Sequence, residues 1–353
     1  MNVYDCEQWV RDIDKVMTVL PELDMMAGKS VLVTGAAGLV CSSIVDVFFR
    51  YNDTHDNKIN ILAAGRWIEE MQRRFGEQVN RADFCFVKYD ASQMGNVIEK
   101  KADYIIHGAS NASPDMIIKE PVETMMSNIL GVKELLDYAK HCNSHRILYI
   151  SSSEVYGEKN GDKPYKEDEY GYIDLLKPRN SYSLGKRAAE TLCVSYSAEY
   201  GVDSIIVRPG HIYGPTASEY DVRVSSMWAY NAAKSDNIVM KSKGEQIRSY
   251  VYSLDCASAI IKVLLSGKKG IAYNISNPES IISIRELAKY LSEAGGVKVQ
   301  TEIPTEDEKK GFNPMSNSSL EADNLLKLGW RGCFNAKTGL EHTVDILKEI
   351  IYR

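Results

Sequence analysis

The stretch "KSVLVTGAAGLV", residues 29–40, decides the fold of this chain of 353 residues. It begins as a short apolar run that predicts a strand, and a helical apolar pattern starts near Leu39. Gly35 and Gly38 lie where the strand turns into the helix, and Cys41 takes the place of a usual third glycine. A helix N-terminus presents free backbone N–H groups to phosphate, so the turn predicts a dinucleotide site rather than a plain structural turn.

After this turn, short apolar runs alternate with helical patterns along the chain. The alternation predicts an α/β fold with a doubly wound, Rossmann-type parallel sheet. After Gly210 the alternation loosens, which predicts a smaller C-terminal substrate lobe. We expect an N-terminal helical extension (1–28), a Rossmann domain (29–208, with part of 245–275) and a lobe that mainly binds substrate (209–353). The apolar runs are "KINILAAGR", "DFCFVKYD", "DYIIHGAS", "RILYISSSEVYG" and "DSIIVRPG".

Composition narrows the class of protein. The chain is 44% hydrophobic and 25% charged, with a formal charge of -6 and no basic stripe, which argues against a nucleic-acid partner. Its seven cysteines are scattered and form no C-x-x-C pair, so we expect neither a metal site nor a disulfide framework. The sequence shows no leader pattern and no apolar run of membrane length, so we expect a cytoplasmic protein with no membrane partner.

The second predicted strand ends in "LAAGRW", where an acidic residue would accept the ribose hydroxyls of NAD. Arg66 stands there instead. A guanidinium group in this place can stack on adenine or contact a 2′-phosphate, and it can also be an ordinary solvated arginine at a helix start. The sequence therefore predicts NAD without excluding NADP.

Two further patterns carry chemistry. "YISSSEVYG" brings Ser152, Ser153 and Glu154 to the carboxyl edge of the sheet, where open α/β sheets bind ligands. "NSYSLGKRAAETL" places Tyr182 one helical turn before Lys186. A free tyrosine has a pKa of about 10, so a role as base near neutrality needs roughly 4 kcal/mol of differential stabilisation. A lysine one turn away and a nicotinamide cation together are its expected sources.

Together these motifs resemble the extended short-chain dehydrogenase/reductase family, specifically its nucleotide-sugar epimerases, dehydratases and decarboxylases. The resemblance spans almost the whole chain after Lys29 and includes "HGASNASPD", "RPGHIYGP", "GEQIRSYVYSLD" and "LLKLGW". "ASNASP", "PVETMMSNILGVKELLDYA" and "DVRVSS" look most like UDP-glucuronate decarboxylases, whereas "SSSEVYG" also looks like sugar 4,6-dehydratases. The family resemblance implies a nucleotide-sugar substrate, NAD as cofactor and a homodimer.

The resemblance also implies a role for each matching residue. Tyr182 would accept a proton from the sugar 4-hydroxyl, Lys186 would bind the ribose, and Ser152 would contact the same hydroxyl. His211 departs from the Asn-containing stretch of relatives, so a core or capping role is the alternative for it. The implied site is catalytic Tyr182, Lys186, Ser152, Ser153 and Glu154; cofactor-binding Gly35, Ala37, Gly38, Leu39, Val40, Arg66, Asp90, Ala91, Ala109, Ser110, Tyr182, Lys186 and Pro209; and substrate-binding Arg223, Arg248 and His211.

The choice of reaction depends on two neighbouring residues. Glucose-type dehydratases carry an Asp immediately before this Glu to protonate the leaving hydroxyl, and here that residue is Ser153. A decarboxylase expels no water, so Ser153 favours decarboxylation, and Glu154 argues mildly against a plain 4-epimerase. A non-catalytic dinucleotide sensor is a more distant alternative, because Tyr182, Lys186 and Ser152 are all present.

Overall fold

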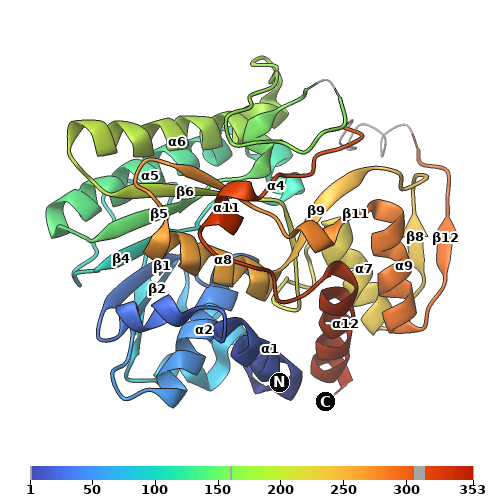
Figure 1. Cartoon of the computed structure of the whole chain (residues 1–353), viewed down its shortest axis with the longest axis horizontal. Coiled ribbons are helices and arrows are strands. Elements are labelled where there is room, and N and C mark those ends of the chain that lie inside the picture. The colour runs from blue at the N-terminus through green and yellow to red at the C-terminus, as the bar shows by residue number, and fades with distance from the viewer. Residues whose placement is uncertain (1, 160, 306–314, 353) are drawn as a thin grey trace.

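The protein is built around one seven-stranded parallel sheet, seen in a computed structural model that describes residues 2–159, 161–305 and 315–352 (Figure 1). The strand order is β10-β6-β5-β4-β1-β2-β3. The order reverses between β1 and β4, which is the topological switch point of a doubly wound sheet. The predicted fold class is therefore confirmed. The strands are β1 (Ser30–Thr34), β2 (Asn60–Gly65), β3 (Phe84–Lys88), β4 (Tyr104–His107), β5 (Arg146–Ile150), β6 (Ser204–Pro209) and β10 (Ala272–Ile275).

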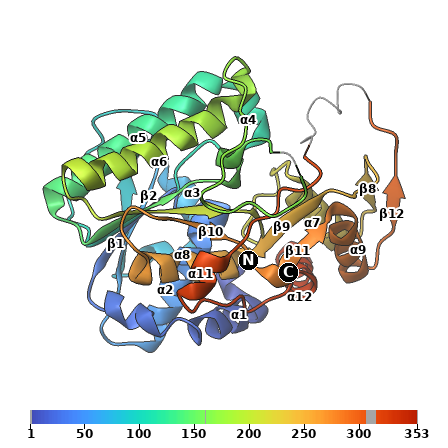
Figure 2. The same ribbon diagram turned by 45° about the horizontal axis from the view of Figure 1, so that its top comes forward.

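Helices cover both faces of this sheet. On one face α5 (Pro121–Cys142) and α6 (Ser181–Glu199) lie side by side (Figure 2). On the other face α2 (Leu39–Thr54) packs against α8 (Ser253–Ser266), and α3 (Ile68–Phe75) follows β2. The short helix α4 (Pro114–Lys119) precedes α5.

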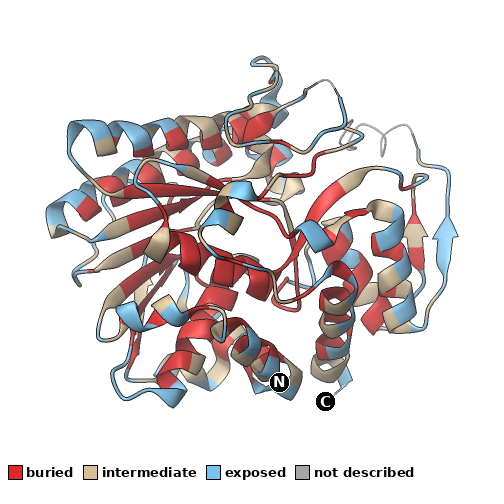
Figure 3. Cartoon of the chain, viewed as in Figure 1, coloured by how far each residue is buried: buried red, intermediate tan, exposed pale blue. Residues whose placement is uncertain are grey.

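The central strands are apolar on both sides because both sides are covered. In β1, Val31 and Val33 belong to the core beneath α2 and α8, whereas Leu32 belongs to the core beneath α5 and α6. This alternation follows from the two-residue period of a strand. All three side chains are fully buried, and Figure 3 shows the same burial along the neighbouring strands.

The C-terminal part adds two small sheets and further helices. One sheet has the order β11-β9-β7 and the other pairs β12 with β8. The chain leaves this part to form α8 and β10, and β10 pairs with β6 at the edge of the large sheet. The remaining elements are β7 (His211–Tyr213), β8 (Ile238–Met240), β9 (Ile247–Tyr252), β11 (Ile281–Ser283), β12 (Val299–Thr301), α7 (Val224–Ala233), α9 (Ile284–Gly295), α11 (Asp323–Lys327) and α12 (Ala336–Tyr352).

The N-terminal helix α1 (Glu7–Met17) docks against α2, α8 and α12. Trp9 is fully buried there, and its indole Nε1 donates a 2.8 Å hydrogen bond to Asp46 Oδ2 on α2. Tyr252 on β9 donates its hydroxyl to Asp12 at 3.0 Å. The extension therefore contacts both the Rossmann part and the C-terminal part of the chain.

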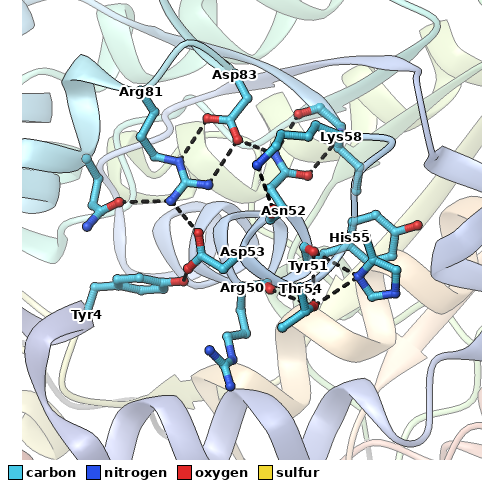
Figure 4. A network of polar contacts seen from close by, with 12 residues as sticks. Tyr4, Arg50, Tyr51, Asn52, Asp53, Thr54, His55, Lys58, Arg81 and Asp83 are labelled. Carbon is cyan, nitrogen blue, oxygen red and sulfur yellow. Dashed lines mark hydrogen bonds and ion pairs between the residues drawn. The ribbon is translucent and has the colours of Figure 1, made fainter.

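A polar network anchors the start of the chain to the edge of the large sheet (Figure 4). Tyr4 donates its hydroxyl to Asp53 at 2.7 Å, and the Arg81 guanidinium pairs with both Asp53 and Asp83. Asn52 donates its amide to Asp83 at 2.9 Å.

None of the described helices combines the length and apolar character needed to cross a membrane.

Candidate active site

One cavity of about 1930 Å³ runs along the carboxyl edge of the large sheet. Its walls come from the β1–α2 turn, from the ends of β2 to β6, from α6, and from α7, β8 and β9 of the C-terminal part. Every catalytic, cofactor-binding and substrate-binding residue predicted from the sequence lines it. The structure thus brings the predicted set together, and the role of each residue stays a prediction.

The β1–α2 turn has the backbone shape that its glycines require. Gly35 has a φ of +67°, and a Cβ on it would lie 3.0 Å from the Ala109 backbone. Gly38 is the N-cap of α2 and provides no side-chain cap, so the first N–H groups of the helix lack a side-chain acceptor. Cys41, which takes the place of the third glycine, is buried against Gly108, so strand and helix pack closely here.

Polar groups just after the ends of β3 and β4 fix the loops that form the next part of the cavity wall. Asp90 accepts hydrogen bonds from the Ser92 backbone N–H at 3.0 Å and the Ser92 hydroxyl at 2.7 Å. Ser110 donates its hydroxyl to Asn128 on α5 at 3.0 Å. Ala91 packs against Gly131 of the same helix. These contacts fix the loops in which the cofactor contacts were predicted.

Tyr182 and Lys186 point into the buried interior of the site from α6. Tyr182 is 7% exposed, and burial together with the Glu154 carboxylate raises the pKa of its phenol to about 12. A hydrogen bond with Ser152 and the charges of Arg223 and Arg179 offset this increase only in part. Without a ligand, the phenol is therefore protonated near neutrality.

The expectation that Lys186 lowers this phenol pKa together with a nicotinamide cation stays a prediction. Its ammonium donates a 2.8 Å hydrogen bond to the Ile150 carbonyl, and its Nζ lies 5.7 Å from the centre of the Tyr182 ring. The side chain also lies over the Tyr149 ring at 4.7 Å. Burial lowers the pKa of Lys186 itself to about 7, because the buried ammonium is poorly solvated.

Glu154 is held by a group that the sequence reasoning missed. Arg179 donates to both carboxylate oxygens, at 2.9 and 3.0 Å, and the Ser183 hydroxyl donates to Oε2 at 3.1 Å. The backbone N–H of Glu154 donates to Ser152 Oγ at 3.1 Å, which fixes the start of the 3₁₀ turn Ser153–Tyr156. Arg179 comes three residues before Tyr182, so a cation this close to the tyrosine motif was the available signal.

The substrate side of the cavity carries two arginines in different settings. Arg223 forms a bidentate pair with Asp221 at the start of α7. Arg248 is 3% exposed and donates to the carbonyls of Ile247 and Met315, and no carboxylate among the described residues pairs with it. The described residues thus show no inter-lobe salt bridge at Arg248.

His211 lies beside them, tilted against the Tyr250 ring at 5.5 Å. Its Nδ1 is buried and has no hydrogen-bond partner among the described residues. Burial and the charge of Arg248 lower the pKa of His211 to about 4, so the ring is neutral near neutral pH. The described residues contain no group of three or more metal-ligating side chains.

The protein thus combines a Rossmann-type sheet with one large cavity along the carboxyl edge of that sheet. The chain belongs to the NAD dependent epimerase/dehydratase family, whose sequence profile matches residues 31–276. It is therefore an enzyme of that NAD-dependent family, as the sequence motifs predicted.

Individual relatives agree with this assignment. UDP-glucuronic acid decarboxylase 1 of Xenopus tropicalis is 28% identical over 323 residues, covering 91% of this chain and 72% of the relative. UDP-glucuronic acid decarboxylase 6 of Arabidopsis thaliana is 29% identical over 314 residues, covering 88% and 86%. The solved UDP-glucose 4-epimerase of Thermotoga maritima, with UDP-glucose, has a TM-score of 0.75 at 21% identity and covers 91% of this chain and 99% of that one.

Proposed function

We propose that this protein decarboxylates a nucleotide-linked hexuronate, with UDP-glucuronate as the expected substrate, through a 4-keto intermediate. The observation that carries the proposal is the single cavity in which Tyr182, Ser152 and the Arg179–Glu154 pair lie beside the glycine turn and below Arg248. Similarity to curated UDP-glucuronic acid decarboxylases over about nine-tenths of the chain supports it.

The cavity residues fit a nicotinamide dinucleotide. The positive φ of Gly35 and its contact with Ala109 leave room only for backbone, and the uncapped start of α2 suits a pyrophosphate. Ala37, Leu39 and Val40 line the cavity there, and Pro209 lines it further along the sheet edge. When bound, the dinucleotide supplies the hydride acceptor and returns the hydride later, so it is not consumed.

In the proposed mechanism, Tyr182 accepts the proton of the sugar 4-hydroxyl as C4 is oxidised to a ketone. Ser152 contacts this hydroxyl and keeps it near the phenol oxygen. Because the protein alone raises the phenol pKa to about 12, the step needs positive charge brought by the ligands in addition to Lys186. Tyr182 returns its proton to the C4 oxygen when the ketone is reduced.

The ketone makes the C6 carboxylate a β-keto acid. The bond between C5 and C6 breaks and carbon dioxide leaves. The electron pair of this bond forms the enolate of the C4 ketone, and a proton then adds to C5. No hydroxyl leaves, so no acid is needed next to Glu154, where Ser153 stands. Arg179 and Ser183 donate to Glu154, which supports a role in positioning the sugar and in proton movement at C5.

The nucleotide and sugar are expected above the sheet edge. Arg248 has a buried guanidinium in the cavity wall, and no carboxylate among the described residues pairs with it, which suits a diphosphate. His211 offers a neutral ring whose Nδ1 has no partner in the described part of the chain, so it would contact the sugar or phosphate by hydrogen bonding. Arg223 would act from the mouth of the cavity, where Asp221 orients it.

A 4,6-dehydratase acting on a hexose nucleotide is the second candidate. The observation that favours it is the position of Glu154 in the cavity, since a carboxylate there can remove a C5 proton. Such an enzyme would need an acid other than residue 153 to protonate the leaving hydroxyl.

A homodimer through α5 and α6 is part of the same proposal. These helices pack together on one side of the sheet, and Val122, Met126 and Val194 expose 67%, 39% and 45% of their surface. Light scattering tests this point, and a monomer at micromolar concentration would contradict it.

The test of the proposed chemistry is a turnover experiment with a trace of oxidised dinucleotide. We expect many product molecules per dinucleotide and no net reduced nicotinamide, since the hydride returns to the sugar. The Tyr182→Phe variant serves as the inactive control with unchanged packing. Reduced nicotinamide accumulating in step with product would identify a simple dehydrogenase instead.

A further inference from the structure

The end of β2 closes the part of the cavity expected to receive the adenosine ribose of a dinucleotide. In an NAD site this strand end carries a carboxylate that accepts the ribose hydroxyls. Here the strand ends in Ala64 and Gly65, and Arg66 follows. A Cβ on Gly65 would lie 2.6 Å from the Met71 methyl group, so the packing of α3 favours no side chain at this point.

Two arginines at this end have no anionic partner within the described part of the chain. Arg66 and Arg73 both line the cavity and are both exposed to solvent. Neither side chain forms an ion pair or hydrogen bond with another described residue. Glu70 and Arg74 also line it and share a face of α3 with Arg73. The Arg74 guanidinium already has an anionic partner, because it forms an ion pair with the buried Asp46.

The wall behind these arginines also has unused hydrogen-bond donors. Asn2 Nδ2 and Arg74 Nε are buried and have no partner among the described residues. Asn2 reaches this wall because the 3₁₀ turn Val3–Asp5 packs against α3, and its Oδ1 accepts from Arg74 at 3.4 Å. Both of these atoms are donors and suit an anion, whereas Oδ1 of Asp46, the carboxylate that pairs with Arg74, is an acceptor that likewise lacks a partner in the described part of the chain.

We propose that this end of the cavity is a phosphomonoester subsite that binds the 2′-phosphate of NADP. Arg66 and Arg73 are its direct ligands, since a guanidinium can bind two phosphate oxygens at once and a phosphomonoester carries close to two negative charges. Behind them, Asn2 Nδ2 and Arg74 Nε supply hydrogen-bond donors, while the charge of Arg74 stays paired with Asp46. The chain then differs from the NAD dependence of its family through an arginine where a carboxylate would stand.

Glu70 is the group that opposes this assignment. It lies on the same face of α3 as Arg73, and its carboxylate would repel a 2′-phosphate but could accept a ribose 2′-hydroxyl. Asp90 also lines this end, but Ser92 occupies its Oδ1. Replacing Glu70 therefore has opposite consequences for a phosphate subsite and for a ribose-hydroxyl subsite.

The test measures binding of 2′,5′-ADP and of ADP to the full chain by calorimetry, after bound nucleotide is removed. Wild type should bind 2′,5′-ADP about tenfold more tightly than ADP at low salt, and added salt should reduce this preference. The double variant Arg66→Ala, Arg73→Ala should lose the preference and keep its affinity for ADP. Arg285→Ala removes an exposed arginine outside the cavity lining and should change neither affinity.

Glu70→Gln supplies the opposite perturbation and should tighten binding of 2′,5′-ADP. Equal affinity of wild type for the two nucleotides would overturn the proposal. Weaker ADP binding in Glu70→Gln, with no gain for 2′,5′-ADP, would also overturn it and would assign Glu70 to the ribose hydroxyls of NAD. Neither result affects the proposed decarboxylation, because no sugar substrate takes part in the measurement.

Discussion

Replacing Lys186 by methionine should stabilise the nucleotide-free protein and inactivate it. The side chain is 3% exposed, and burial lowers its pKa from 10.5 to about 7. Between these two pH values the unfolded chain holds a proton that the folded chain releases. The folding cost of this lysine is therefore absent above pH ~10.5, grows as the pH falls, and is complete below pH ~7. Methionine has a similar length and does not titrate.

The size of the effect follows from the pKa difference. Each pKa unit corresponds to about 1.4 kcal/mol, so the cost of Lys186 is about 4 kcal/mol at pH ~7 and about 2 kcal/mol at pH ~9. The variant loses the hydrogen bond to the Ile150 carbonyl and the contact with the Tyr149 ring, together about 2–3 kcal/mol. The net gain at pH ~7 is then about 1–2 kcal/mol.

Urea unfolding at both pH values measures this directly. The wild-type free energy of unfolding should rise between pH ~7 and ~9 by about 2 kcal/mol more than that of Lys186→Met. Lys133→Met is the matched control, because this lysine lies on the surface of α5 with 47% of its side chain exposed, and it should keep the wild-type pH dependence. Identical pH dependence in wild type and Lys186→Met would refute the burial argument, whatever happens to activity.

Three further changes test other parts of the account. Tyr182→Phe should lower turnover by ~10²-fold or more with unfolding almost unchanged, whereas loss of folding with normal specific activity would make Tyr182 a structural residue. Gly35→Ala puts a Cβ 3.0 Å from the Ala109 backbone at a φ of +67°, so calorimetry should show weaker dinucleotide binding, and unchanged affinity would argue against this turn as the phosphate site. Glu190→Ala leaves the buried Arg208 guanidinium without the carboxylate that it contacts at 2.9 and 2.7 Å. Urea unfolding should show that the free energy of unfolding falls by about 3–5 kcal/mol. A decrease below about 1 kcal/mol would mean that Arg208 finds another partner.

Local patterns made much of the fold and site predictable. The glycine turn, the apolar strands and the tyrosine–lysine spacing each depend on a few neighbouring residues, and the sheet topology then gathers the strand ends at one edge. The sequence therefore predicts that Gly35 and Tyr182 belong to one site, and both line the same cavity. The turn residues Gly35 and Gly38 have the backbone roles that the motif required.

Other features depend on contacts between distant residues, which a single sequence does not reveal. The Arg179–Glu154 pair joins residues 25 positions apart, and Asn2 reaches Arg74 across 72 positions. In the protein alone, burial raises the phenol pKa of Tyr182, and burial depends on the packing of the whole site, which the spacing to Lys186 does not reveal. The sequence left adenine stacking, a 2′-phosphate contact and plain solvation open for Arg66, because its lack of an ionic partner among the described residues is a property of the folded surface.

The most direct test of the proposed function is the mass of the product formed from UDP-glucuronate. The protein would be incubated with UDP-glucuronate and, separately, with UDP-, dTDP-, GDP- and CDP-hexoses, each with traces of NAD and NADP. We expect that UDP-glucuronate alone changes and that it loses the mass of carbon dioxide. Loss of water from a hexose nucleotide, with UDP-glucuronate left intact, would contradict it.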